Sequence, residues 1–137
     1  MDREKLVRLA REAAARAYAP YSHFRVGAAL LLSDGTVITG SNVENRSYGL
    51  TNCAERSAIF TAVSRGRTDF TALAVYSPES ELPLPPCGAC RQVISEFVSG
   101  DFPVLCASAS GVIEEVPMKG LLPKDSLKNF KETGKNG

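Results

Sequence analysis

The chain has almost no excess of charge of either sign. It contains 16 Lys and Arg residues and 15 Asp and Glu residues, so the formal net charge is only +1 at pH 7. Proteins that capture nucleic acid concentrate basic side chains against the phosphates. The composition therefore argues against a nucleic-acid partner and favours a small, weakly charged ligand.

A long apolar segment is also missing. Residues 1–5 are mostly charged and lead into a segment rich in Ala and Arg. A secretory signal needs an apolar region near the N-terminus, and a membrane-spanning helix needs about 20 mostly apolar residues. We therefore expect a cytoplasmic protein with no membrane partner.

No low-complexity linker divides the 137 residues, of which 44% are hydrophobic. The proline-rich stretch 78–86 is too short to separate two domains. A chain of this length is sufficient for one hydrophobic core. We expect a single domain over residues 1–123 and a Lys-rich C-terminal tail over residues 124–137.

Four cysteines could in principle form two disulfides, but a reducing compartment and the short Cys87-x-x-Cys90 spacing favour metal binding. Cys53 precedes Glu55 by two residues and completes a set of three thiols. Three thiolates suit zinc and leave its fourth position open, as in catalytic rather than structural sites. Cys106 lies in an apolar stretch, where a buried core cysteine is expected.

Hydrophobic periodicity and turn residues predict a chain of mixed helices and strands. Ser33-Asp34-Gly35 is typical of a hairpin turn. Residues 108–111 are too few for a crossover helix, so the fifth strand should run antiparallel to the fourth. Two helices join strands, and we expect a parallel strand pair flanking each. Helices are predicted at 2–17, 53–64 and 87–98, strands at 25–32, 36–43, 69–77, 102–107 and 112–116, and a short apolar element at 120–123.

The stretch Cys53-Ala54-Glu55-Arg56, followed by Pro86-Cys87-x-x-Cys90, resembles the signature of the zinc deaminases. The chain is similar nearly end to end to the small, homotetrameric, three-cysteine cytidine deaminases. This resemblance implies an α/β fold with three α-β-α layers and a mixed five-stranded sheet, its fifth strand antiparallel to the fourth. It also implies one Zn²⁺ per chain, a homotetramer with shared active sites, and a place in pyrimidine salvage.

The reaction that the resemblance implies is hydrolytic deamination of cytidine and deoxycytidine to uridine and deoxyuridine, with release of ammonia. Glu55 would be the catalytic residue, moving a proton from water to N3 of the pyrimidine and later to the leaving amine. Taken alone, Asn52-x-x-Glu55 is also a plausible capping box, in which the glutamate serves only the start of a helix.

Arg56 is expected to act on the thiolates rather than on the substrate. Three thiolates leave a divalent zinc with a net negative charge, which opposes acidification of water. Helix N-termini at Cys53 and Cys87 and a charge-assisted hydrogen bond from Arg56 would withdraw electron density from the sulfurs. The alternative is an exposed arginine in the second turn of a helix.

Five residues are assigned to the substrate by resemblance. Phe24 would pack on the face of the pyrimidine, and Asn42 and Glu44 would hydrogen-bond the ribose hydroxyls. Ala54 would also contact the substrate, and Tyr48 would reach the active site of an adjacent subunit. Ordinary roles stay open for four of them: core packing for Phe24 in the aromatic loop, a solvated strand end for Asn42 and Glu44, and a surface-loop tyrosine for Tyr48.

The C-terminal region departs from the family pattern. Relatives usually carry a Phe three residues after Leu-Leu-Pro, where this chain has Ser126, and Phe130 is a candidate replacement. Three other functions share parts of this pattern: a structural zinc module, a redox Cys-x-x-Cys protein, and a deaminase of another aminated nucleoside such as a blasticidin-type antibiotic. The last shares the metal motifs and is the main alternative.

Overall fold

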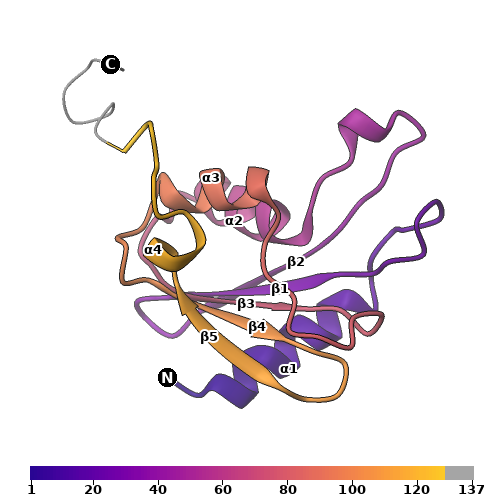
Figure 1. Cartoon of the computed structure of the whole chain (residues 1–137), viewed down its shortest axis with the longest axis horizontal. Helices are drawn as coiled ribbons and strands as arrows, with labels where there is room; N and C mark the ends of the chain where they lie inside the picture. The colour runs from indigo at the N-terminus through magenta and orange to yellow at the C-terminus, as the bar shows by residue number, and fades with distance from the viewer. Residues whose placement is uncertain (129–137) are drawn as a thin grey trace.

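The computed structural model describes residues 1–128 and is built around one five-stranded sheet with the strand order β2-β1-β3-β4-β5 (Figure 1). Phe130, the candidate replacement for the missing family phenylalanine, lies outside the described residues. The strands are β1 (Gly27–Leu32), β2 (Val37–Ser41), β3 (Phe70–Tyr76), β4 (Pro103–Ala107) and β5 (Ile113–Pro117). The helices are α1 (Arg3–Ala14), α2 (Ala54–Ser64), α3 (Gly88–Ser95), α4 (Met118–Leu121) and the 3-10 turn η1 (Tyr48–Leu50).

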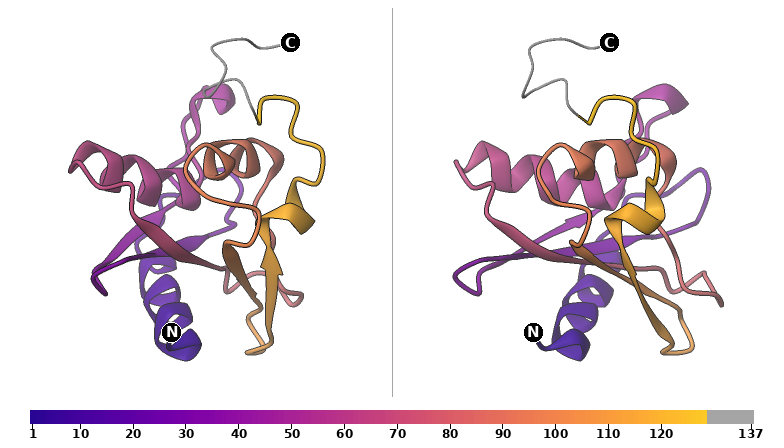
Figure 2. Two further views of the ribbon diagram at one scale, coloured as in Figure 1. Left: turned by 90° about the vertical axis from the view of Figure 1, so that its left-hand side faces the viewer. Right: turned by 60° about the vertical axis from the view of Figure 1, so that its left-hand side comes forward.

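Helices cover both faces of the sheet, with α1 on one face and α2 and α3 on the other (Figure 2). Alternate residues of β1 divide between the two cores: Leu30 packs with α2 and α3, and Ala29 packs with α1. The predicted three-layer α-β-α fold is therefore confirmed. Within residues 1–128 the longest helices fall short of the length and apolar character that crossing a bilayer requires.

Strand directions agree with the prediction at both helices, but the two strands are direct neighbours at only one of them. β3 and β4 are adjacent and parallel around α3, and β5 is antiparallel to β4, as expected. β2 and β3, which flank α2, also run in the same direction, but they do not pair with each other as expected, because β1 lies between them and is antiparallel to both. The physical reason is the composition of β1, whose apolar residues are largely buried on both faces and suit a central position.

The helices that carry the motif cysteines begin one residue later than predicted. Cys53 and Cys87 are N-cap residues with extended backbone angles, so α2 and α3 start at the next position. Gly40 on β2 allows α2 to approach the sheet closely, since a Cβ there would lie 2.5 Å from both Ala54 O and Ala58 N. This contact fixes where the N-terminus of α2, and with it Cys53, lies.

Candidate metal centre

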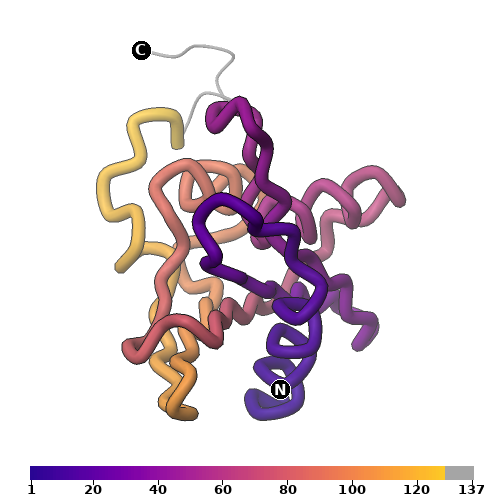
Figure 3. The backbone as a smooth tube through the Cα atoms, turned by 90° about the vertical axis from the view of Figure 1, so that its right-hand side faces the viewer, coloured from indigo at the N-terminus to yellow at the C-terminus, as the bar shows by residue number. Residues whose placement is uncertain are grey.

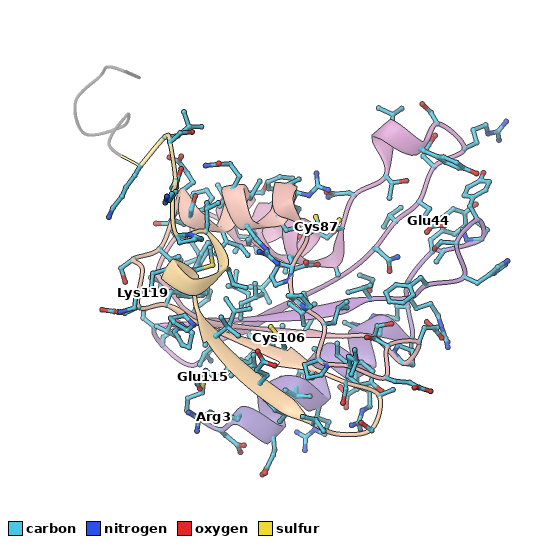
Figure 4. The ribbon with its side chains drawn as sticks, in the orientation of Figure 1. Arg3, Glu44, Cys87, Cys106, Glu115 and Lys119 are labelled. Atoms are coloured by element: carbon cyan, nitrogen blue, oxygen red, sulfur yellow. The ribbon has the colours of Figure 1, made fainter. Side chains whose placement is uncertain are left out.

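Three thiols from two helices meet on the α2–α3 side of the sheet. Cys53 and Cys87 cap α2 and α3 without using their side chains in the caps, and Cys90 lies one turn into α3, fully buried. The three sulfur atoms lie within 4.8 Å of one another, and Cys53 Sγ is 3.7 Å from Cys87 Sγ. Figure 4 shows Cys87 at the start of α3, where its side chain is exposed.

This spacing fits tetrahedral zinc. Zn–S bonds of about 2.3 Å at tetrahedral angles separate two sulfurs by about 3.8 Å. Among residues 1–128, these three thiols form the one group of side chains close enough together to hold a metal ion. Cys106 is buried in β4 and does not belong to this group. The donor set therefore fits a zinc ion with one position left for water or substrate.

The guanidinium of Arg56 contacts the thiol group directly. Arg56 Nη2 donates to Cys53 Sγ over 3.2 Å, from the first turn of α2. The pKa of Cys53 is lowered to about 5, chiefly by a hydrogen bond from the Cys90 thiol and further by Arg56, while the pKa of Cys90 is raised by the same coupling and by burial. Arg56 Nε is buried and lacks a hydrogen-bond partner among the described residues, so this N–H is available to a further acceptor at the site.

Glu55 lies beside the thiols and is almost completely buried, with 4% of its surface exposed. Burial raises its pKa to about 7, and the nearby Cys53 thiolate adds to the rise. The capping-box alternative does not describe the local structure, because the N-cap is Cys53 and the backbone N–H of Asn52 donates to Val43 O instead. The buried carboxyl next to the three thiols therefore does not serve as the helix cap that the sequence also allowed.

Asn42 and Glu44 both contact the loop that carries Phe24. Asn42 is buried, with its Oδ1 accepting from Val26 N and its Nδ2 donating to Phe24 O, each over 2.8 Å. The Glu44 carboxylate accepts from the backbone N–H groups of Tyr21 and Ser22 and from the Ser22 hydroxyl. Sequence reasoning did not foresee this support of the loop.

The arm formed by residues 43–52 extends from the body of the protein and carries η1 (Figures 1 and 4). Tyr48 on this arm is 74% exposed, and its ring contacts Tyr21 edge to face, with centroids 5.9 Å apart. Tyr21, Glu44 and Tyr48 help to line a cavity of about 430 Å³, and no cysteine lines it. Ala54 is fully buried.

Arg91 follows Cys90 directly, and the sequence alone assigned it no role. Its Nε donates to Pro86 O over 2.8 Å, and its Nη1 donates to Leu121 O over 2.9 Å. The side chain therefore fastens the residue before Cys87 to α4. Its position directly after Cys90 was the available signal, but the acceptors are carbonyl groups, which no sequence pattern identifies.

Comparison with known proteins agrees with this site. A family model described as cytidine and deoxycytidylate deaminase zinc-binding region matches residues 1–106. The chain is 53% identical to a cytidine deaminase of Halalkalibacterium halodurans, over 90% of this chain and 92% of that protein. It is 54% identical to one of Sporosarcina psychrophila, over 90% of each.

A crystal structure of cytidine deaminase from Burkholderia pseudomallei superposes with a TM-score of 0.87 at 45% identity, covering 90% of this chain and 98% of that one. A blasticidin-S deaminase of Bacillus cereus is more distant, at 32% identity over 91% of this chain and 92% of that protein. With the three-thiol site and the shared fold, these similarities establish that the chain belongs to the family of zinc-dependent cytidine deaminases.

Proposed function

We propose that this enzyme deaminates cytidine and deoxycytidine hydrolytically, giving uridine and deoxyuridine with release of ammonia. The observation that carries the proposal is the meeting of three thiols within 4.8 Å beside the buried Glu55. Identities of 53% and 54% to cytidine deaminases, each over 90% of this chain, support the choice of substrate.

Cys53, Cys87 and Cys90 would hold the zinc ion, one per chain. When bound, zinc supplies the Lewis acidity that makes water a nucleophile near neutral pH. Arg56 would offset the negative charge of the thiolates through its hydrogen bond to Cys53. The N-termini of α2 and α3, which begin directly after Cys53 and Cys87, would add partial positive charge at the same place.

Glu55 would carry protons between the reacting groups. It accepts a proton from the attacking water and delivers it to N3 of the pyrimidine. It then takes a second proton from the hydroxyl group added at C4 and gives it to the amine, which leaves as ammonia while the C4 carbonyl forms. Burial beside the thiols supports this role, since it keeps the carboxyl close to the reacting atoms and away from bulk water.

Phe24, Asn42, Glu44 and Ala54 would bind the nucleoside. Phe24 would lie on the pyrimidine, and the backbone of Ala54 would contact the base. Asn42 and Glu44 each use hydrogen-bonding capacity on the Phe24 loop, but an amide has a second hydrogen and a carboxylate has further lone pairs for ribose hydroxyls.

A homotetramer with shared active sites is part of the proposal. Large apolar side chains are exposed on the arm, at Val43, Tyr48 and Leu50, and on the outer face of α2, at Phe60 and Val63. Exposed apolar groups of this extent favour contact with another protein surface. Tyr48, at the tip of the arm, would then complete the pocket of a neighbouring copy.

The cellular setting and the domain limits are also proposed. All four cysteines are free thiols, which persist in a reducing compartment such as the cytoplasm. There the reaction would serve pyrimidine salvage. We assign the catalytic domain to residues 1–123, which include every described helix and strand, and the tail to residues 124–137.

The test is an ultraviolet time course with zinc-quantified protein, cytidine, deoxycytidine and a panel of other aminated nucleosides that includes blasticidin S. We expect the cytidine and deoxycytidine spectra to decay with release of one ammonia per turnover. Turnover of blasticidin S with inert cytidine would instead favour the alternative substrate. Stoichiometric zinc with no turnover of any nucleoside would point to a structural zinc module.

A further inference from the structure

The loop of residues 18–26 carries Phe24 but has little regular structure of its own. Within it, His23 N donates to Ala19 O, and His23 has a left-handed backbone with φ of 58°. Figure 3 shows this loop in front of the molecule, with the arm on one side and the segment that follows β3 on the other. Its conformation therefore depends on side chains from these two neighbours.

The arm side of the loop is held by Asn42 and Glu44, as described above. On the other side, Glu79 accepts two hydrogen bonds from one residue: Arg25 N donates to Oε2 over 2.8 Å, and Arg25 Nη2 donates to Oε1 over 2.7 Å. The backbone bond is the more consequential of the two, because it fixes the peptide that joins Phe24 to Arg25.

Glu79 is itself well anchored. Its backbone N–H donates to the hydroxyl of Ser77, a residue fully buried at the end of β3. Next to it, Ser80 O accepts from Ala109 N in the turn between β4 and β5. Arg25 lowers the pKa of the Glu79 carboxyl, so the carboxylate is ionised at neutral pH. With 29% of the side chain exposed, it is partly shielded from water.

Glu79 also belongs to the segment that leads to the metal site. Residues 77–86 run from the end of β3 to Pro86, the residue directly before Cys87. The carbonyl of Pro86 accepts the hydrogen bond from Arg91. The carboxylate of Glu79 therefore connects the loop that would hold the pyrimidine with the segment that holds a zinc ligand.

We propose that Glu79 is a positioning residue for the nucleoside: by binding the backbone and guanidinium of Arg25, it fixes Phe24 relative to the Cys87 segment. This inference rests on the proposed function, since Phe24 is taken as the surface on which the base packs. A residue in this role affects how well the substrate is held more than how fast bound substrate reacts.

Four variants separate the contributions. Glu79→Ala removes both hydrogen bonds, Glu79→Gln keeps an oxygen for Arg25 N, and Arg25→Ala keeps the backbone bond while removing the ion pair. Glu115→Ala is the matched control, because it breaks a comparable ion pair with Arg3 that joins β5 to α1.

We expect Glu79→Ala to raise KM for cytidine about threefold to tenfold, with kcat within about twofold of the wild type, because charge-assisted hydrogen bonds at a half-exposed site are of moderate strength. Glu79→Gln and Arg25→Ala should each raise KM by about twofold or less, because each retains a bond to the backbone of residue 25. All should bind one zinc per chain, and Glu115→Ala should match the wild type. In hydrogen exchange, residues 18–26 should lose protection in Glu79→Ala and not in Glu115→Ala.

The inference is overturned if Glu79→Ala has a wild-type KM and wild-type exchange in the loop. It is also overturned if the variant loses zinc and kcat together, because Glu79 would then serve the metal segment. If the wild type deaminates a different nucleoside, the proposed function fails alone, and the same comparison of KM with that substrate decides the role of Glu79.

Discussion

Glu55 and Arg56 are consecutive residues that place opposite charges beside the same thiols. The carboxyl is buried and is proposed to exchange protons with the reacting atoms, whereas the guanidinium donates to a sulfur. Adjacent positions on one helix turn thus serve different parts of the chemistry. Substitutions at each position in turn, with zinc content and activity measured for both, separate the two roles.

Glu55→Gln keeps the size of the side chain and removes its ability to carry a proton. We expect the variant to retain one zinc per chain and to lose activity by about 100-fold or more, the usual contribution of general acid–base catalysis. Metal analysis and kcat measure the two effects, with the exposed Glu12→Gln of α1 as control. Near-normal deamination by zinc-replete Glu55→Gln would remove Glu55 from the mechanism.

Arg56→Ala removes the hydrogen bond to Cys53 and leaves the three ligands in place. Loss of such a supporting bond typically costs about 10- to 100-fold in metal affinity or activity. Competition with a zinc chelator, followed optically, measures the affinity directly. Arg65→Ala at the C-terminal end of α2 is the matched control, and wild-type zinc affinity and activity in Arg56→Ala would contradict the assigned role.

At the scale of elements, an ion-pair cluster fastens the β1–β2 turn to the start of β3. Arg67 donates to both carboxylate oxygens of Asp69, over 2.8 and 2.7 Å, and lies 3.2 Å from Asp34. The hydrogen bonds from Arg67 lower the pKa of Asp34 to about 2 and hold the pKa of Asp69 well below its usual range. Ser33 also donates to Asp69, from its backbone and its hydroxyl.

The sign of the resulting pH dependence follows from these shifts. Because both pKa values are lower in the folded than in the unfolded state, where aspartate titrates near pH 3.9, the cluster stabilises the fold above about pH 4. That contribution is lost as the pH falls from about 4 to about 2. The midpoint temperature of thermal unfolding should therefore be lower for Arg67→Ala than for the wild type at pH 7, and this difference should shrink below pH 4. A difference that stays constant from pH 7 to pH 2 would contradict this explanation.

Elements defined by local pattern were predicted from the sequence. The helical spacing of Ala54, Ala58 and Ala62 corresponds to a fully buried stripe on α2, and the turn at Gly35 has the left-handed φ of 90° that glycine favours. The antiparallel β5 also followed from the short joint before it. In each case the decisive interactions lie within a few residues of one another.

Interactions between distant segments were not predictable in the same way. Arg25 and Glu79 are 54 positions apart, and the acceptors of Arg91 are backbone carbonyls. The central position of β1, between β2 and β3, likewise depends on how sheet edges are buried in the whole fold. The cysteine motif identified the candidate metal site, but the supports of the Phe24 loop emerged only from the structure.

At the scale of the whole molecule, the arm of residues 43–52 is the feature that a single chain leaves unexplained. It extends away from the sheet and exposes Leu50 by 72% and Tyr48 by 74%. Apolar side chains this exposed are stabilised when another surface covers them. In the proposed tetramer, a neighbouring copy would cover the arm and the cavity that Tyr21, Glu44 and Tyr48 help to line.

Light scattering coupled to size-exclusion chromatography tests the assembly, and we expect a mass of four chains. Leu50→Asp should weaken the tetramer and lower activity, because a charge would be buried in the contact. Leu82→Asp, at an equally exposed leucine outside the arm, should leave both unchanged. A wild-type protein that stays monomeric while fully active would exclude shared active sites.

Cys53, Cys87 and Cys90 are proposed to bind the zinc that cytidine deamination requires. Zinc is removed with a chelator under reducing conditions, and the rate of cytidine loss is measured while zinc is added back. We expect activity to disappear on removal and to return in proportion to bound zinc, reaching its maximum at one zinc per chain. Deamination that persists in zinc-free protein, or zinc binding that restores no deamination, would contradict it.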